Sequence, residues 1–172
     1  MKHGMTVKLF AMCFCVTAFS LLTQHAAAGD GAKGKLVVDG KKVEITQAYA
    51  YAEKGFFDNE KQDVVVLLCD APVLPAAVRD FFARKELIDS GKLHCVEQII
   101  NSEKQVVNFK VHDKSFGSRP PSGGSTEHVF DAKTFDGITV AGRSYTKSQQ
   151  SSFDDIPYSY DITFSAPIGP MK

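Results

Sequence analysis

Residues 63–70 read Asp-Val-Val-Val-Leu-Leu-Cys-Asp, and this stretch decides the fold. Residues 64–69 are all apolar and include three β-branched valines. A run this short with this composition predicts a β-strand and not a helix. Its apolar character does not alternate, as it would if one face met water. We therefore expect a central strand with another layer packed on each face.

The segment after this strand predicts one main helix over residues 76–90. Pro75 suits the first turn of a helix, and Gly91 is a typical stop after its last residue. The apolar positions, which form one stripe, are Ala77, Val78, Phe81, Phe82, Leu87 and Ile88. We expect the helix to cover one face of the sheet and to bring Phe81 and Phe82 into the core. Because it joins two strands, a single crossover unit can be embedded in the sheet.

The rest of the chain is rich in strand and turn signals. Its β-prone runs, each bounded by turn residues, are 35–52, 93–100, 105–112, 138–146 and 156–166. The first run contains Asp39-Gly40, a strong hairpin signal. The fold class we expect is α+β: a curved, mostly antiparallel sheet of about seven or eight strands, or a partial barrel, with one main helix packed on it.

The first 28 residues predict a secretory signal peptide. Lys2 and Lys8 supply positive charge, residues 9–22 are largely apolar, and three alanines at 26–28 precede Gly29. A membrane anchor is the alternative, but an apolar run of about 14 residues is shorter than the roughly 20 that a membrane span needs. We expect cleavage before Gly29 and a secreted or periplasmic location.

The expected organisation is a signal peptide (1–28), a flexible leader (29–34), one globular domain (35–168) and a tail (169–172). Cleavage would remove two of the 20 basic residues and none of the 20 acidic ones, which leaves a net charge near −2. A chain with this balance has no general attraction to nucleic acid or anionic lipid. We therefore expect no nucleic-acid partner and no membrane contact after cleavage, but an unknown protein or small ligand.

Cys69 and Cys95 are the cysteines that remain after cleavage, because Cys13 and Cys15 lie in the signal segment. An even pair in an exported chain favours a disulfide. The two residues fall at the ends of predicted neighbouring strands, where such a bridge can be reached. Two buried free thiols are the alternative.

No catalytic or metal-binding motif stands out. His94, His112 and His128 lack the spacing of paired metal ligands, and no G-x-S-x-G motif occurs. Ser144 and Lys147 match S-x-x-K, but in a predicted strand they point to opposite faces. We therefore predict no catalytic residue, no metal and no cofactor.

Candidate binding residues fall in loops. Residues 113–126 contain Pro and Gly pairs that predict an irregular loop, and a loop of this length is either functional or mobile. Phe56 and Phe57 either tuck beneath a charged loop or contact a ligand. Asp154 and Asp155 are either solvated turn residues or a sugar or calcium contact. The candidate ligand-binding residues are Phe56, Phe57, Phe116, Arg119, Asp154 and Tyr158.

Two functional classes follow from these patterns. The first is an exported, non-catalytic protein that binds a macromolecule or small ligand through its aromatic and Pro/Gly-rich loops. The second is a secreted or periplasmic hydrolase whose site assembles from dispersed residues such as His112, His128 and Asp154. We favour the first because catalytic motifs are missing and aromatic residues recur in the loops.

Overall fold

The computed structural model describes residues 31–171, so the predicted signal peptide lies outside the described residues. The strands are β1 (Gly31–Val38), β2 (Lys41–Ile45), β3 (Gln47–Lys54), β4 (Gln62–Cys69), β5 (Cys95–Ile100), β6 (Val106–His112), β7 (Ser122–Gly123), β8 (His128–Phe135), β9 (Thr139–Thr146), β10 (Gln150–Ser151) and β11 (Pro157–Gly169). The helices are α1 (Pro75–Val78), α2 (Phe81–Asp89) and a single 3₁₀ turn, η1 (Lys114–Phe116).

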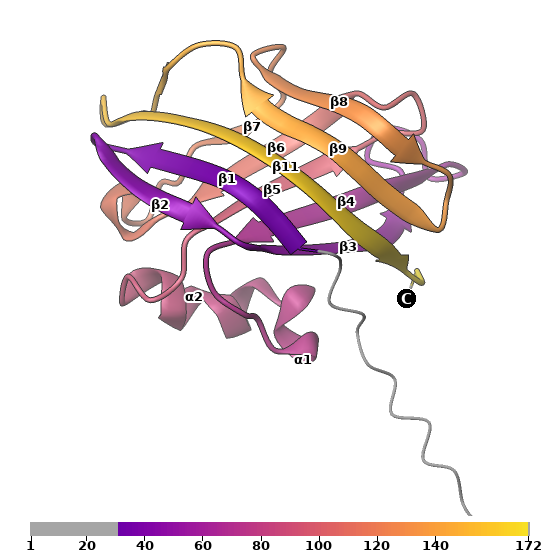
Figure 1. The fold of residues 1–172 in the computed structure, drawn as a ribbon, viewed down its shortest axis with the longest axis horizontal. Coiled ribbons are helices and arrows are strands. Elements are labelled where there is room, and N and C mark those ends of the chain that lie inside the picture. The colour runs from indigo at the N-terminus through magenta and orange to yellow at the C-terminus, as the bar shows by residue number, and fades with distance from the viewer. Residues whose placement is uncertain (1–30, 172) are drawn as a thin grey trace, which may run out of the picture.

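The long strand β11 joins two curved halves of one sheet (Figure 1). Sheet A comprises β2, β1, β11, β9 and β8, with β10 also on β11, and its pairs are antiparallel. Sheet B comprises β3 to β7, all paired antiparallel. The end of β11, at Ile168 and Gly169, pairs with β3 in parallel and connects the halves. The predicted curved, mostly antiparallel sheet is confirmed as a half-barrel. Its main order holds eight strands, within the expected number, and β8, β9 and β10 are added to it through β11.

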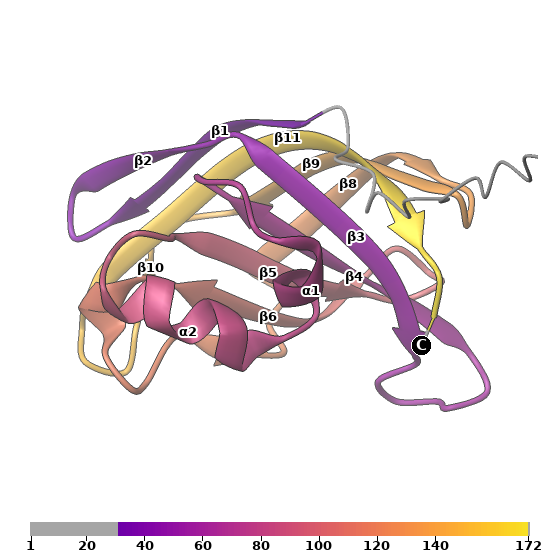
Figure 2. The same ribbon diagram turned by 90° about the horizontal axis from the view of Figure 1, so that it is seen from below.

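Strand β4 is covered on both faces, as its sequence predicts. Val66 and Leu68 pack into the main core between sheets A and B. Leu67 and Cys69 pack into a second core beneath the helices. Figure 2 shows α1 and α2 in front of strands β4–β6. Residues 63–69 are all buried, so a fully apolar strand is what this position requires.

The predicted single helix is broken in two. Asp80 begins a new helix, because its Oδ1 accepts hydrogen bonds from the backbone N–H groups of Phe82 (2.9 Å) and Ala83 (3.2 Å). The break turns Phe82 to solvent, with 81% of its surface exposed, so the expectation that both phenylalanines enter the core is wrong. The embedded crossover is also absent from the described residues, since β4 and β5 pair directly and antiparallel.

Arg84 lies outside the predicted apolar stripe, yet it is buried on α2, with 2% of its surface exposed. Its Nη1 donates to the carbonyl of Ala77 at 2.9 Å and to that of Val78, carbonyls at the end of α1. Its Nη2 donates to Glu97 Oε2 on β5 at 2.7 Å. Arg84 therefore satisfies the C-terminal carbonyls of one short helix and ties the other to the sheet.

The N-terminal boundary of the domain lies earlier than expected. Gly31, Ala32, Lys33 and Gly34, expected in a flexible leader, pair with β11 as part of β1. A Cβ at Gly34 would lie 2.1 Å from the carbonyl oxygen of Asp161, so only glycine permits this close approach. The small residues that allow the pairing also hide the strand from a pattern based on β-branched residues.

Cys69 and Cys95 form a disulfide across the paired ends of β4 and β5, with S–S 2.14 Å. Both residues are fully buried. The predicted bridge is confirmed in preference to two free thiols, and it is compatible with an oxidising, extracellular environment.

We expect the Cys69→Ser/Cys95→Ser variant to lose roughly 3 kcal/mol of unfolding free energy, because the bridge closes a 26-residue separation in the unfolded chain. Urea denaturation followed by circular dichroism measures the loss. The matched control is wild type with reductant present, which should approach the variant. A midpoint unchanged by either treatment would contradict this role of the bridge.

Candidate functional site

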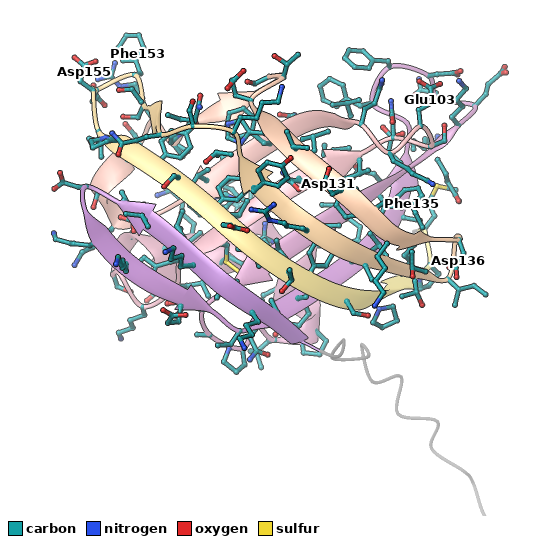
Figure 3. All side chains as sticks on the ribbon, turned by 45° about the horizontal axis from the view of Figure 1, so that its top comes forward. Glu103, Asp131, Phe135, Asp136, Phe153 and Asp155 are labelled. Carbon is teal, nitrogen blue, oxygen red and sulfur yellow. A yellow bond between two sulfur atoms is a disulfide. The ribbon has the colours of Figure 1, made fainter. Side chains whose placement is uncertain are left out.

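Two loops and the edge of sheet B form a pocket of about 700 Å³, which we call the loop pocket. Its walls are residues 118–122 and 151–153, with Phe109, Lys110 and Tyr158 between them. The pocket belongs to the end of the molecule where Figure 3 places Phe153 and Asp155, opposite the turn that carries Glu103. The Pro/Gly-rich loop predicted from the sequence therefore contributes one complete wall.

The first wall is more ordered than the sequence predicted. Asp113 Oδ1 accepts a hydrogen bond from the backbone N–H of Ser115 at 2.7 Å and begins the turn η1. Further along, β7 pairs with β6, with Gly123 opposite Phe109. The expectation that residues 113–126 exclude regular structure is wrong, because an Asp cap and a free sheet edge supply the missing partners.

Three polar side chains link the start of this wall to the disulfide-bridged ends of β4 and β5. His94 Nδ1 lies 2.8 Å from Asp70 Oδ2, and His94 Nε2 lies 3.5 Å from Asp113 Oδ2. Asp70 and His94 directly adjoin Cys69 and Cys95 in the chain. The loop therefore leaves the sheet from a rigid point, which fixes where the pocket wall begins.

Arg119 connects the two walls. It forms an ion pair with Asp154, and its guanidinium carbon lies 4.4 Å from the centre of the Phe153 ring. Both charged side chains are largely exposed, so the pair adds at most about 1 kcal/mol to stability. Its effect is positional: it brings together two predicted site residues that are 35 positions apart.

Tyr158 forms the floor of the loop pocket and is only 3% exposed. Phe116 is also 3% exposed, and its ring meets that of Tyr158 edge to face at 5.8 Å. Phe116, a predicted binding residue, therefore supports Tyr158 from within the core and is not available at the surface.

Phe56 and Phe57 lie at the opposite end of the molecule, in the β3–β4 loop. That loop contacts the β5–β6 turn through Lys61 and Glu103, whose charged atoms are 3.8 Å apart. The two phenylalanines do not tuck beneath the loop, since 51% and 80% of their surfaces are exposed. The structure therefore separates them from Arg119, Asp154 and Tyr158.

A chain of buried polar side chains runs inward from Tyr158, and we call it the interior network. Ser144 Oγ donates to Gln98 Oε1 (2.7 Å), and Gln98 Nε2 donates to the Tyr160 hydroxyl (2.9 Å). His128 bridges the two tyrosines, with Nδ1 2.7 Å from the Tyr160 hydroxyl and Nε2 3.3 Å from that of Tyr158. Buried polar groups that satisfy one another in this way hold a single arrangement.

Burial keeps the interior network neutral. It lowers the pKa of His128 to about 4 and raises the pKa of Tyr158 to about 12, and burial likewise raises the pKa of Tyr160. At neutral pH the histidine is therefore uncharged and both tyrosines keep their protons. The stack of Phe109 on His128, with ring centres 3.4 Å apart, closes the network behind the pocket.

Sequence reasoning missed Gln98 and Ser144 as parts of this assembly. Each is a polar residue within a predicted strand, and nothing local distinguishes an inward from an outward amide or hydroxyl. The one available signal was the inward face shared by Tyr158 and Tyr160, which implied that two hydroxyls needed buried partners.

The residues suggested for a hydrolase do not converge. His112 is on the helix side of sheet B, where its Nε2 lies 3.5 Å from Glu97 Oε2. His128 lies between the two halves of the sheet, and Asp154 is at the surface. Within residues 31–171, no group of three or more His, Cys, Asp or Glu side chains is arranged to hold a metal ion.

A second hollow, of about 750 Å³, lies over strands β1, β8, β9 and β11. Its polar lining includes Arg143, which donates to both carboxylate oxygens of Asp161 at 2.8 and 2.9 Å. This is the wet outer face of sheet A, where Asp161 already holds Arg143. The loop pocket differs because loops form its walls and a buried tyrosine forms its floor.

No family model, curated protein or solved structure matches this chain. None of the helices in the described part of the chain is long and apolar enough to cross a membrane.

The buried state of His128 predicts a pH-dependent stability. The unfolded chain binds a proton at this residue near pH 6.5, whereas the folded protein binds it only near pH 4. The unfolding free energy should therefore fall, by about 3 kcal/mol, as the pH drops through this window. Urea titrations between pH 7 and 4 measure the slope.

The His128→Gln variant should show a shallower slope, whatever its absolute stability. Some slope should remain, because burial also lowers the pKa of His112. An identical slope in wild type and variant would contradict the buried, neutral state of His128.

Proposed function

We propose that this protein is exported and binds a small ligand in the loop pocket without chemically changing it. The observation that carries the proposal is the convergence of Arg119, Asp154, Phe153 and Tyr158 from separate segments. Arg119, Phe153 and Tyr158 line a space of about 700 Å³, within the range of roughly 300–1,000 Å³ that is usual for small-molecule sites, and Asp154 pairs with Arg119 beside it.

The composition of the pocket supports binding over catalysis. The exposed ring of Phe153, the half-buried Pro120 and the buried Pro121 lie among polar residues along the two walls, around a buried floor. Loops that carry such residues on a rigid sheet are common binding surfaces. Ser144, the buried serine of the interior network, contacts Gln98 and not a histidine, so it lacks the partner that would activate a nucleophile.

Export is supported by the sequence of residues 1–28 and is compatible with the Cys69–Cys95 bridge. The hydrolase alternative is less well supported, because His112 lies on the helix side of sheet B whereas His128, on β8, lies between the two halves of the sheet. A macromolecular partner that binds the exposed phenylalanines Phe56 and Phe57, at the other end of the molecule, is the second form of the proposal.

The proposal is tested by titrating ¹⁵N-labelled protein with a small-fragment library that contains neutral, cationic and anionic aromatic compounds. We expect the hits to shift backbone amides of residues 118–122 and 151–153. Phe153→Ala should weaken these hits by about threefold or more, since it removes the exposed aromatic wall.

Phe57→Ala is the matched control, because Phe57 and Phe153 are exposed to 80% and 79% and lie at opposite ends. It should leave the shifts at 118–122 and 151–153 unchanged. Hits confined to the Phe57 loop, or no hits at any described amide, would contradict binding in the loop pocket.

A further inference from the structure

The charged lining of the loop pocket restricts the chemical class of its ligand. Of the residues that line it, Lys110 and Arg119 carry charge, and both are cations. Asp154 does not line the pocket but holds Arg119 from the side. The charged side chains that line the pocket are therefore cationic, which favours an anionic group over a cationic one.

Arg119 has donors to spare for such an anion. A guanidinium carries five N–H donors, and the contact with Asp154 uses Nη2. Arg143 offers a comparison within the same protein: it is also paired and also stacked on an aromatic ring, but both Nε and Nη2 are bound to Asp161. Arg119 is thus the less saturated of two similar arginines.

Lys110 is the second cation of the lining, but its ammonium group lies toward the helices. It is on β6, lines the loop pocket and also lines a smaller hollow of about 270 Å³ that includes Glu97. Its Nζ lies 4.1 Å from the centre of the Phe81 ring, a contact with an aromatic face and not with a carboxylate. The ammonium group is therefore on the helix side of β6, next to the cross-strand neighbour Glu97, and Arg119 is the cation left to bind a ligand of the loop pocket.

The uncharged part of the lining favours a planar apolar body. The exposed ring of Phe153 gives a flat apolar surface beside the half-buried Pro120, and the Arg119 guanidinium lies over that ring. We propose that the ligand of the loop pocket carries a carboxylate on a planar apolar body, with the carboxylate bound to Arg119. This inference rests on the proposed function and names the class of ligand for that same site.

A matched pair of probes tests the inference: benzoate, and its neutral analogue benzamide, titrated into ¹⁵N-labelled protein at constant ionic strength. Benzoate should shift the amides of residues 118–122 and 151–153 and bind at least about fivefold more tightly than benzamide. Inorganic phosphate, an anion without an apolar body, should bind more weakly than benzoate.

Two variants of the loop pocket should act in opposite directions. Arg119→Gln removes the guanidinium and should weaken benzoate about fivefold, with little effect on benzamide. Asp154→Asn removes the competing carboxylate and should strengthen benzoate about twofold or more. Arg143→Gln, on the outer face of sheet A, is the control and should change neither affinity.

Each other outcome overturns a stated part of the inference. If benzoate and benzamide shift these amides with equal affinity, the proposed carboxylate recognition is contradicted, but binding in the loop pocket is not. Phosphate bound as tightly as benzoate would overturn the planar apolar body. No shift with either aromatic probe would overturn the ligand class, and the fragment library then decides whether the pocket binds anything at all.

Discussion

The burial of β4 on both faces is the constraint on which the rest of the structure depends. A strand made of Val, Leu and Cys cannot leave either face in water without a large loss of hydrophobic free energy. Sheet A covers one face through the long strand β11, and α1 and α2 cover the other. The half-barrel, the helix layer and the disulfide at the end of β4 all follow from this requirement.

The loop pocket inherits its rigidity from the same core. Its first wall leaves the sheet beside the Cys69–Cys95 bridge, where His94 links Asp70 and Asp113. Its floor, Tyr158, rests on Phe116 and on the interior network. A pocket built on loops therefore has two fixed sides, and a ligand would not need to order them on binding, which favours affinity.

The sequence predicted the structure correctly where a residue pattern is compatible with only one local structure. The run 64–69 predicted a doubly covered strand, and the two cysteines predicted a bridge. The pattern failed where one polar residue changes the local outcome: Asp80 caps a second helix, and Arg84 is buried because it satisfies backbone carbonyls. The sequence also placed Arg119 and Asp154 among the site candidates, but their pairing depends on tertiary structure. Phe116 could not be assigned to the core, because its position in a loop does not reveal its burial.

Native-state hydrogen exchange of the backbone amides tests the central claim most directly. The amides of residues 65–68 are paired on both sides by β3 and β5 beneath two covering layers. They should exchange only through global unfolding, with an opening free energy equal to that from denaturant titration. Exchange of these amides at a much lower free energy, as fast as that of edge strand β8, would contradict a fold organised around β4.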